Sequence, residues 1–302
     1  RCMTQITAII LTFNEEKHIA RCIKSLQSVC SRICIIDSLS TDRTIEIAKD
    51  LGADVFSHVW ENNYAKQLNW GIQEAQIQTD WTLRIDADEY LTEELQQEIQ
   101  LKLGGLSSRI SGIEFTRKVL FKGKWIRFGG FYPIHLLRLW RTGMGACEQR
   151  LMDEHIVLSQ GETIRFSEHV VDENLNSIHW WVTKHNNYAR REAADVLNQK
   201  YQFSYTTDLS AAGNSQAHTK RAAKNSFYNR MPLGLRALAY FIFRFIFQLG
   251  FLDHPKVWVF HFMQGLWYRL LVDVNIYEAE KAAQKDPVRL KNIITSDWKI
   301  DC

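Results

Sequence analysis

Strand-type segments alternate with helix-type patterns through the first 85 residues, and this alternation constrains the fold more than any other feature of the chain. Segments 6–11, 33–36, 54–57 and 81–85 predict four short strands with helices between them. Short connections between alternating strands and helices are typical of a parallel, doubly wound sheet. We therefore predict an α/β fold in which a mostly parallel, Rossmann-like sheet is flanked by helices.

Side chains that can bind a ligand follow three of these predicted strands, at Asn14, Asp37 and Asp86. Sheets of this kind bind ligands at the carboxyl ends of their strands. The fourth strand runs into Asp86-Ala-Asp88, and side chains two residues apart in an extended chain point to the same side. Two such carboxylates can hold Mg²⁺ or Mn²⁺ together with substrate phosphates. The alternative is a solvated turn, because composition alone often produces a D-x-D pattern.

The first strand-to-helix turn, Thr12-Phe-Asn-Glu15, contains no glycine. This excludes the glycine-rich dinucleotide fingerprint and the P-loop, so a metal is expected to neutralise any bound diphosphate. Asn14, Glu15 and Asp37 could receive a base and a ribose. The alternative is that Asn14 is only a helix N-cap and Asp37 only a turn former.

Four motifs occur in the order found in family 2 glycosyltransferases, which are inverting enzymes with a GT-A fold. They are Thr12-Phe-Asn-Glu15, Ile36-Asp-Ser-Leu-Ser-Thr-Asp42, Gln67-x-Asn69 and Asp86-Ala-Asp-Glu89. The resemblance covers roughly the first 160 residues and implies a nucleotide-diphosphate sugar donor, with UDP the commonest nucleotide. Leu39 departs from the family pattern, where many members carry glycine or another small residue, and this is expected to loosen the loop.

The resemblance also implies roles for individual residues. Expected nucleoside contacts are Thr12, Asn14, Glu15 and Asp37. Expected supports of the base or the phosphates are Asp42, Lys66, Gln67 and Asn69. Asp86 resembles the ribose or metal-water contact and Asp88 the direct ligand of a Mg²⁺ or Mn²⁺ ion.

An inverting transfer needs a general base on the acceptor side. By resemblance to the acidic pair of the family, Glu154 is the expected base and Asp153 the close alternative; an exposed acidic loop is the other interpretation. His155 could neighbour the metal or a phosphate, although a lone histidine is more often structural. Arg138 and Arg141 could bind a phosphate bidentately or could simply end an amphipathic strand.

The segment 231–276 is rich in aromatic and aliphatic residues, and its most hydrophobic stretch runs from Leu235 to Leu252. Arg236, Tyr240, Arg244 and Gln248 recur every four residues in this stretch and predict one narrow polar stripe on an apolar helix. This pattern fits a helix in the membrane interface better than a spanning one. A basic block without Asp or Glu between Ser210 and Leu252 favours an anionic membrane surface. The alternative is a pair of core or dimer-forming helices.

We predict three parts: residues 1–105 bind the nucleotide sugar, 106–175 form the acceptor side, and 176–302 form a helical region with membrane-interface helices at 231–276. The pattern Trp180-Trp-x-x-Lys-His-x-x-Tyr188 resembles one that recurs in lipopolysaccharide and capsule transferases, or it packs its helix onto the catalytic part. The net charge of +3 is too small to indicate a nucleic-acid partner. The six cysteines form no C-x-x-C pair and no signal peptide is visible, so a reduced, cytoplasmic location is expected.

The predicted function is metal-dependent transfer of a sugar to a hydroxyl of a lipid-linked or lipopolysaccharide acceptor at the cytoplasmic face of the bacterial inner membrane. A homo-oligomer is compatible with this function. The alternatives are a polyprenyl-phosphate glycosyltransferase and a non-catalytic, nucleotide-binding membrane scaffold. A sugar-phosphate nucleotidyltransferase is disfavoured because it would need a glycine-rich loop after the first strand.

Overall fold

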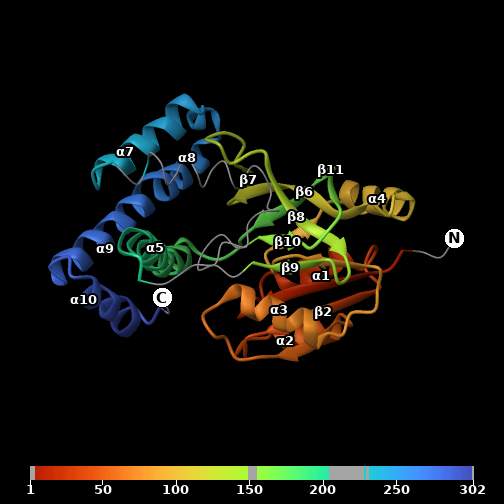
Figure 1. Cartoon of the computed structure of the whole chain (residues 1–302). Helices are drawn as coiled ribbons and strands as arrows, with labels where there is room; N and C mark the ends of the chain where they lie inside the picture. Colours follow the sequence, from red (N-terminus) through yellow and green to blue (C-terminus); the bar gives the residue numbers. More distant parts are fainter. Residues whose placement is uncertain (1–3, 149–154, 204–227, 229–230, 301–302) are drawn as a thin grey trace.

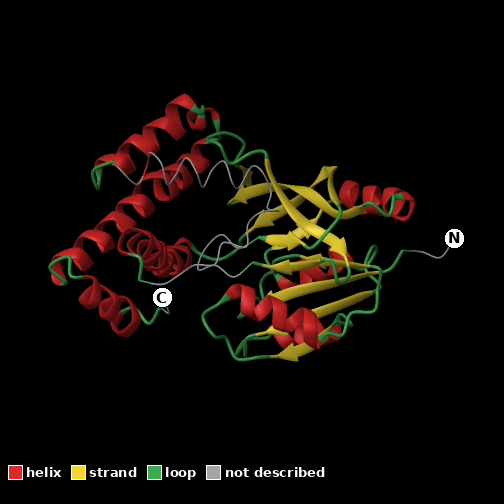
Figure 2. Ribbon diagram, in the orientation of Figure 1, coloured by secondary structure: helices red, strands yellow, loops and turns green. Residues whose placement is uncertain are grey.

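The computed structural model describes residues 4–148, 155–203, 228 and 231–300 of the chain. A nine-stranded sheet with helices on both sides forms one part of the molecule, and a cluster of helices from the last 125 residues forms the other (Figures 1 and 2). The α/β class predicted from the sequence is confirmed.

The parallel part of the sheet has the strand order β3-β2-β1-β4. Helices connect these strands, as the alternating sequence pattern predicts. The bounds are β1 (Ile6–Thr12), α1 (Ile19–Leu26), β2 (Arg32–Asp37), α2 (Thr44–Asp50), β3 (Asp54–Ser57), α3 (Tyr64–Glu74) and β4 (Trp81–Arg84).

Strand β1 is mostly apolar, with Thr7 and Thr12 as its two polar residues, because both of its faces are covered. Ile6 and Ile10 pack with Ile23 of α1 on one face, whereas Ile9 packs with Leu68 of α3 on the other. A central parallel strand buried in this way is a continuous apolar run. Packing on both faces therefore holds these strands in place, and the carboxyl ends of β1, β2 and β4 lie at one edge of the sheet.

The rest of the sheet is mixed, so the sheet is parallel throughout only across its first four strands, and a mostly parallel sheet was expected. β4 pairs antiparallel with β8, β8 antiparallel with β6, β6 parallel with β11, and β11 antiparallel with β5. The bounds are β5 (Glu89–Leu91), α4 (Glu93–Lys102), η1 (Leu103–Gly105), β6 (Ile110–Phe121), β7 (Lys124–Trp125), β8 (Ile134–Arg141) and β11 (Glu162–Glu173), and β9 (Gly145–Cys147) and β10 (Ile156–Leu158) form a separate hairpin. Strands from both sides of residue 105 belong to one sheet.

The helical part is built on α5 (Ile178–Tyr201), which packs along α9 (Tyr268–Ala282). Small residues of α5, such as Ala189 and Ala193, lie in one buried cluster with Val272 and Ile276 of α9. The remaining bounds are α7 (Leu235–Ile242), η3 (Phe243–Phe247), η4 (Gly250–Leu252), α8 (Pro255–Phe262), η5 (Met263–Trp267), α10 (Pro287–Asn292) and η6 (Ile293–Asp297).

The polar stripe predicted on the helix after Leu235 exists, but it faces the protein. Arg236 is buried and donates to Asp273 of α9 at 2.7 Å. Arg244 donates to the Gly129 carbonyl and lies 3.8 Å from the Phe131 ring centre. The stripe forms ion pairs and hydrogen bonds because a buried charge is costly without a partner. Consequently the apolar side of this helix faces outward.

No helix in the described part of the chain is both long and apolar enough to span a membrane.

Candidate active site

The ends of β1 and β2 are joined by a buried hydrogen bond. Thr12 and Asp37 are paired in register, and the Thr12 hydroxyl donates to Asp37 Oδ1 at 2.7 Å. Ser40 donates to the same carboxylate from its backbone N–H at 2.7 Å and from its hydroxyl at 2.6 Å. The Asp37 side chain is therefore fixed at the end of its strand before any ligand binds.

Asn14 is not a helix N-cap, contrary to one interpretation of the sequence. Its φ is +55°, its Oδ1 accepts the Thr41 N–H at 2.8 Å, and α1 begins only at Ile19, after a turn. Asparagine tolerates this left-handed conformation better than most residues. Asn14 thus connects the loop after β1 to the loop after β2.

Glu15 and Asp42 complete this connection. Thr44 Oγ1 accepts the Glu15 N–H at 2.7 Å, and Asp42 Oδ2 accepts the Glu16 N–H at 3.1 Å. Burial alone would raise the pKa of Asp42, but hydrogen bonds from Thr44 and Glu16 outweigh it and lower the pKa. The two loops therefore form one ordered rim, and the contact of these residues with a nucleotide stays a prediction.

Leu39 lies on the same rim with a φ of +61° and half of its side chain exposed. Glycine adopts this backbone conformation at no steric cost, whereas a leucine pays for it. This explains why a small residue suits the position in the family pattern. The loop is nevertheless ordered, because Asp37 and Asn14 bind the residues that follow Leu39.

The three residues predicted on α3 point in different directions. Gln67 is buried and donates to the Ser38 hydroxyl at 3.1 Å, so it supports the rim from below. Lys66 is exposed, with its ammonium 3.6 Å from Glu61. Asn69 makes two 2.9 Å bonds with the backbone of Cys147. In this structure Asn69 thus fixes β9 to α3.

Asp86 is held by three side chains at the end of β4. Tyr64 donates to Oδ1 at 2.8 Å, Arg138 donates to Oδ2 at 3.1 Å, and Arg84 lies 3.7 Å from Oδ1. Burial would raise the pKa of Asp86, but the two guanidinium groups hold it well below its usual range. Both oxygens of this carboxylate are therefore occupied by protein groups.

Arg138 is buried and bound by two carboxylates, and its contact with a phosphate stays a prediction. It is 3% exposed and its Nη2 lies 2.5 Å from Glu89 Oε1 as well as bonding Asp86. β8 lies between β4 and β6 in the sheet, so the Arg138 side chain reaches Asp86 and Glu89 from the strand next to β4. Arg141, at the end of the same strand, donates to the Ile110 carbonyl at 2.8 Å.

Asp88 has a different environment from Asp86. Its Oδ2 accepts from Asn174 at 3.0 Å, and its side chain lines a cavity that Asp172 also lines. Burial, followed by the nearby charge of Asp88, raises the pKa of Asp172 to about 6. Two carboxylates that line one cavity suit a hard cation, which takes one or two carboxylates and substrate phosphates as ligands.

The described residues contain no group of three or more His, Cys, Asp or Glu side chains able to hold a metal ion. Sequence reasoning missed Asp172 and Asn174. The available signal was weak: a short apolar pair, Val170-Val171, precedes the carboxylate of Asp172 in a strand that is otherwise largely polar.

Asp153 and Glu154, the predicted base candidates, lie outside the described residues. The segment that contains them connects β9 and β10, which pair as an antiparallel hairpin. His155 follows directly and its N–H donates to Glu148 at 3.1 Å. Because Asn69 of α3 is hydrogen-bonded to the backbone of Cys147, the end of β9 is fixed next to α3.

Comparison with known proteins gives consistent matches to the first part of the chain. Residues 7–107 match the family model described as Glycosyl transferase family 2. An uncharacterized glycosyltransferase of Rickettsia typhi is 43% identical over 98 residues, which are 32% of this chain and 32% of that protein, so this match spans about a third of the relative's length.

Two further matches extend beyond this domain. The lipopolysaccharide core biosynthesis glycosyltransferase LpsC of Rhizobium meliloti is 30% identical over 187 residues, 56% of this chain and 66% of that protein. Among solved structures, residues 1–349 of S. aureus TarS share 13% identity over 93% of this chain and 92% of that one, with a TM-score of 0.44. The sequence matches, together with the motifs after β1, β2 and β4 and on α3, show that residues 7–107 form a glycosyltransferase family 2 domain.

Proposed function

We propose that the protein is a metal-dependent, inverting glycosyltransferase that moves a sugar from a nucleotide-diphosphate sugar to a hydroxyl of a membrane-linked glycan. The observation that carries this proposal is the contrast between Asp86 and Asp88 within the family domain. Asp86 is bound by Tyr64, Arg84 and Arg138, whereas Asp88 lines a cavity beside Asp172. One carboxylate shapes the site and the other is available to a ligand.

Different residues would bind the donor and activate the acceptor. The rim formed by the loops after β1 and β2 would bind the nucleoside, and Asp88 with Asp172 would hold a Mg²⁺ or Mn²⁺ ion. Such a cation, when bound, offsets the negative charge of the departing diphosphate. Glu154 or Asp153, carried by the β9–β10 connection, would take the proton of the acceptor hydroxyl. Attack from the side opposite the leaving group inverts the anomeric configuration.

The acceptor class follows from the LpsC relative and from an exposed apolar face. On α7, η3, η4 and α8 the side chains that point away from the protein are large and hydrophobic: Leu235, Leu238, Ile242, Phe243, Ile246, Phe247, Leu249, Phe251, Leu252, Trp258, Val259 and Phe262. We call these residues the apolar face. It contains more than half of the exposed large hydrophobic side chains of the described residues.

An exposed apolar face of this extent is rare on a protein that works free in water. Arg236 and Arg244 of this segment bind protein groups, so the outward side is left to hydrophobic side chains, which fits a surface lying in the lipid interface. We infer that the protein binds peripherally to a membrane and receives a lipid-linked or lipopolysaccharide acceptor there, with the cytoplasmic face of a bacterial inner membrane as the proposed location. A second copy of the chain is the competing occupant.

The test is a transfer assay with UDP-, GDP- and dTDP-sugars, Mn²⁺, and lipopolysaccharide or polyprenyl phosphate as acceptors, followed by mass spectrometry. The expected result is a mass gain of one sugar on lipopolysaccharide, lost in Glu154→Gln or in Asp153→Asn. Transfer to polyprenyl phosphate that survives both substitutions would favour the lipid-phosphate alternative. Nucleotide binding without transfer to either acceptor would favour the non-catalytic scaffold.

A further inference from the structure

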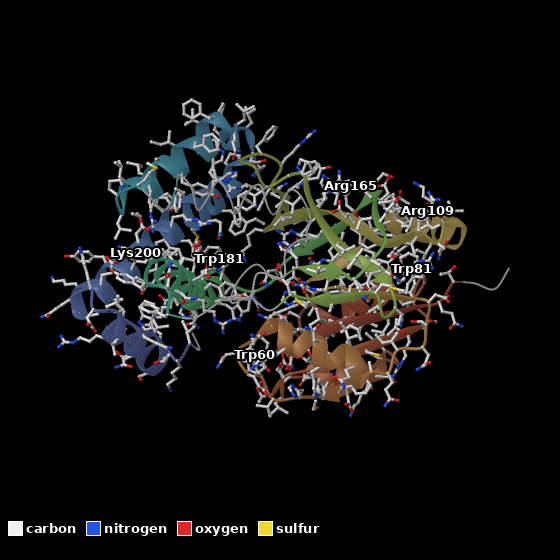
Figure 3. All side chains as sticks on the ribbon, in the orientation of Figure 1. Trp60, Trp81, Arg109, Arg165, Trp181 and Lys200 are labelled. Carbon is white, nitrogen blue, oxygen red and sulfur yellow. The ribbon has the colours of Figure 1, made fainter. Side chains whose placement is uncertain are left out.

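A cavity of about 240 Å³ lies between the first turns of α5 and the ends of β6 and β11. Asp88 and Asp172 line it on the sheet side, and Trp180, Lys184 and Tyr188 line it on the α5 side. Figure 3 shows Trp181, the neighbour of Trp180, at the end of α5 nearest the sheet. Drug-sized ligands occupy sites of about 300–1,000 Å³, so this cavity suits a smaller group.

Lys184 is the distinctive side chain of this cavity. Its ammonium lies 4.7 Å from the ring centre of Trp180 and 5.7 Å from that of Tyr188, so two aromatic rings flank the charge. Burial alone would lower the pKa of Lys184, but Tyr188, Asp88 and Glu15 outweigh it and raise the pKa. The lysine thus keeps its charge close to the predicted metal ligand.

The other two cations that line the cavity already have partners. Arg117 lies 3.5 Å from Asp172, and Lys122 donates to the Asn176 carbonyl at 2.8 Å. In the described part of the chain no carboxylate lies within ion-pair distance of the Lys184 ammonium. A half-buried cation held by aromatic rings is available to an anionic group that enters the cavity.

The aromatic rings indicate a second property of the ligand, a flat apolar face. Trp180 and Tyr188 are half-buried and offer large flat surfaces beside Lys184. Such surfaces pack against apolar faces, and the C–H face of a pyranose ring is flat and apolar enough to use them. The cavity therefore has an aromatic wall, two carboxylates on the sheet side, and Lys184 as a cation without a carboxylate partner among the described residues. The wall and the lysine together match a sugar that also carries a negative charge.

We propose that this cavity is the acceptor subsite and that it selects a sugar bearing a carboxylate or a phosphate, which Lys184 binds while the ring packs against Trp180 and Tyr188. The proposal rests on the glycosyltransferase function proposed above and names its acceptor class. Because Asp88 lines the same cavity, a sugar bound there lies beside the expected position of the donor diphosphate.

The test measures binding of glucose, glucuronate and glucose 6-phosphate by ligand-observed NMR, with UDP, GDP and dTDP binding in Mn²⁺ measured by calorimetry on the same samples. The wild type should bind the two charged sugars about tenfold more tightly than glucose, as expected for one charge-assisted hydrogen bond. Lys184→Gln should abolish this preference and Lys184→Arg should keep most of it. Arg190→Gln removes an exposed charge from the same helix and should change nothing.

Three results would overturn the proposal: equal binding of charged and neutral sugars, a preference that survives Lys184→Gln, or no binding of any of the sugars at millimolar concentrations. A Lys184→Gln protein that loses nucleotide affinity and keeps its sugar preference would assign the lysine to the donor diphosphate instead. Failure of the wild type to bind any nucleotide would contradict the glycosyltransferase proposal, and the sugar measurements would still be read independently.

Discussion

Asp86 and Asp88 are two residues apart, yet their surroundings predict different roles for the two carboxylates. Asp86 neutralises the buried guanidinium groups of Arg84 and Arg138, whereas the Asp88 carboxylate bonds only the Asn174 amide among the side chains of the described residues. Removing one partner of a buried ion pair is costly because it leaves the other charge uncompensated. Stability and ligand binding should therefore respond to different members of the motif.

We predict that Asp86→Asn lowers the free energy of unfolding by about 2 kcal/mol, less than for a fully buried pair because a third of the Asp86 side chain is exposed. Asp88→Asn should change stability by less than about 0.5 kcal/mol, because an amide can still pair with Asn174. Urea unfolding followed by circular dichroism measures both. Equal destabilisation by the two substitutions would show that Asp88 is also a structural residue.

At the scale of single elements, hydrophobic periodicity predicted the strands well, because a strand covered on both faces must be apolar along its length. The predicted starts of β1 and β4 agree with the structure, and helices lie between the first four strands as expected. The start of α1 was wrong because a turn and the left-handed Asn14 separate it from β1, and no spacing rule reveals a backbone conformation of that kind.

The candidate site was predictable where a residue follows a strand in the sequence, as for Asp37, Asp86 and Asp88. It was not predictable where the environment comes from distant segments. Arg138 looks like a phosphate ligand in the sequence, but only the pairing of β8 with β4 brings it to Asp86 and Glu89. Asp172 and Lys184 reach the site through β11 and α5, which lie far along the chain.

The β9–β10 hairpin is the element that should respond to Asn69. Two hydrogen bonds with the Asn69 side-chain amide hold Cys147 at the end of β9, where the segment that leads to Asp153 and Glu154 begins. We predict that Asn69→Ala costs about 1–3 kcal/mol of stability and speeds amide exchange at Cys147, because the substitution leaves buried backbone groups unpaired. Hydrogen exchange followed by mass spectrometry resolves this effect.

Sugar transfer in Asn69→Ala should fall more than nucleotide binding. The hairpin carries the proposed base, whereas the loops after β1 and β2 would bind the nucleotide. Asn187→Ala, at an exposed position on α5, is the matched control. A drop in nucleotide affinity as large as the drop in transfer would place Asn69 with the donor, as the family resemblance first implied.

For the whole molecule, the main consequence of the fold is that the site and the apolar face are close together. Phe260 of α8 lines the cavity, while Trp258, Val259 and Phe262 of the same helix belong to the apolar face (Figure 1). Polar residues anchor α8 to the sheet: Asp253 accepts the Arg127 N–H at 3.0 Å and bonds His261 at 2.8 Å. A membrane on this face would therefore hold an acceptor near Asp88.

We predict that the double substitution Phe243→Ser and Phe247→Ser weakens binding to vesicles of phosphatidylglycerol and phosphatidylethanolamine at least about tenfold. Each phenylalanine contributes about 1.5–3 kcal/mol when it enters an apolar phase, so the loss of two is readily measured by vesicle sedimentation. Leu101→Ser changes a side chain that is 83% exposed on α4, away from this face, and should leave vesicle binding unchanged.

Light scattering on the same proteins separates the two possible occupants of the apolar face. A wild type that ignores vesicles and is dimeric, with the double variant monomeric, would assign the face to a second copy of the chain.

Donor binding by isothermal titration calorimetry tests the central claim most directly. UDP, GDP and dTDP are titrated with and without Mn²⁺ into the wild type, Asp88→Asn, and Asp50→Asn, which changes an exposed carboxylate on α2. We predict that one nucleotide binds only with Mn²⁺, that Asp88→Asn abolishes this binding, and that Asp50→Asn preserves it. Binding that is independent of both Mn²⁺ and Asp88, or absent from the wild type, would contradict the assignment of Asp88 as the metal ligand of a glycosyltransferase.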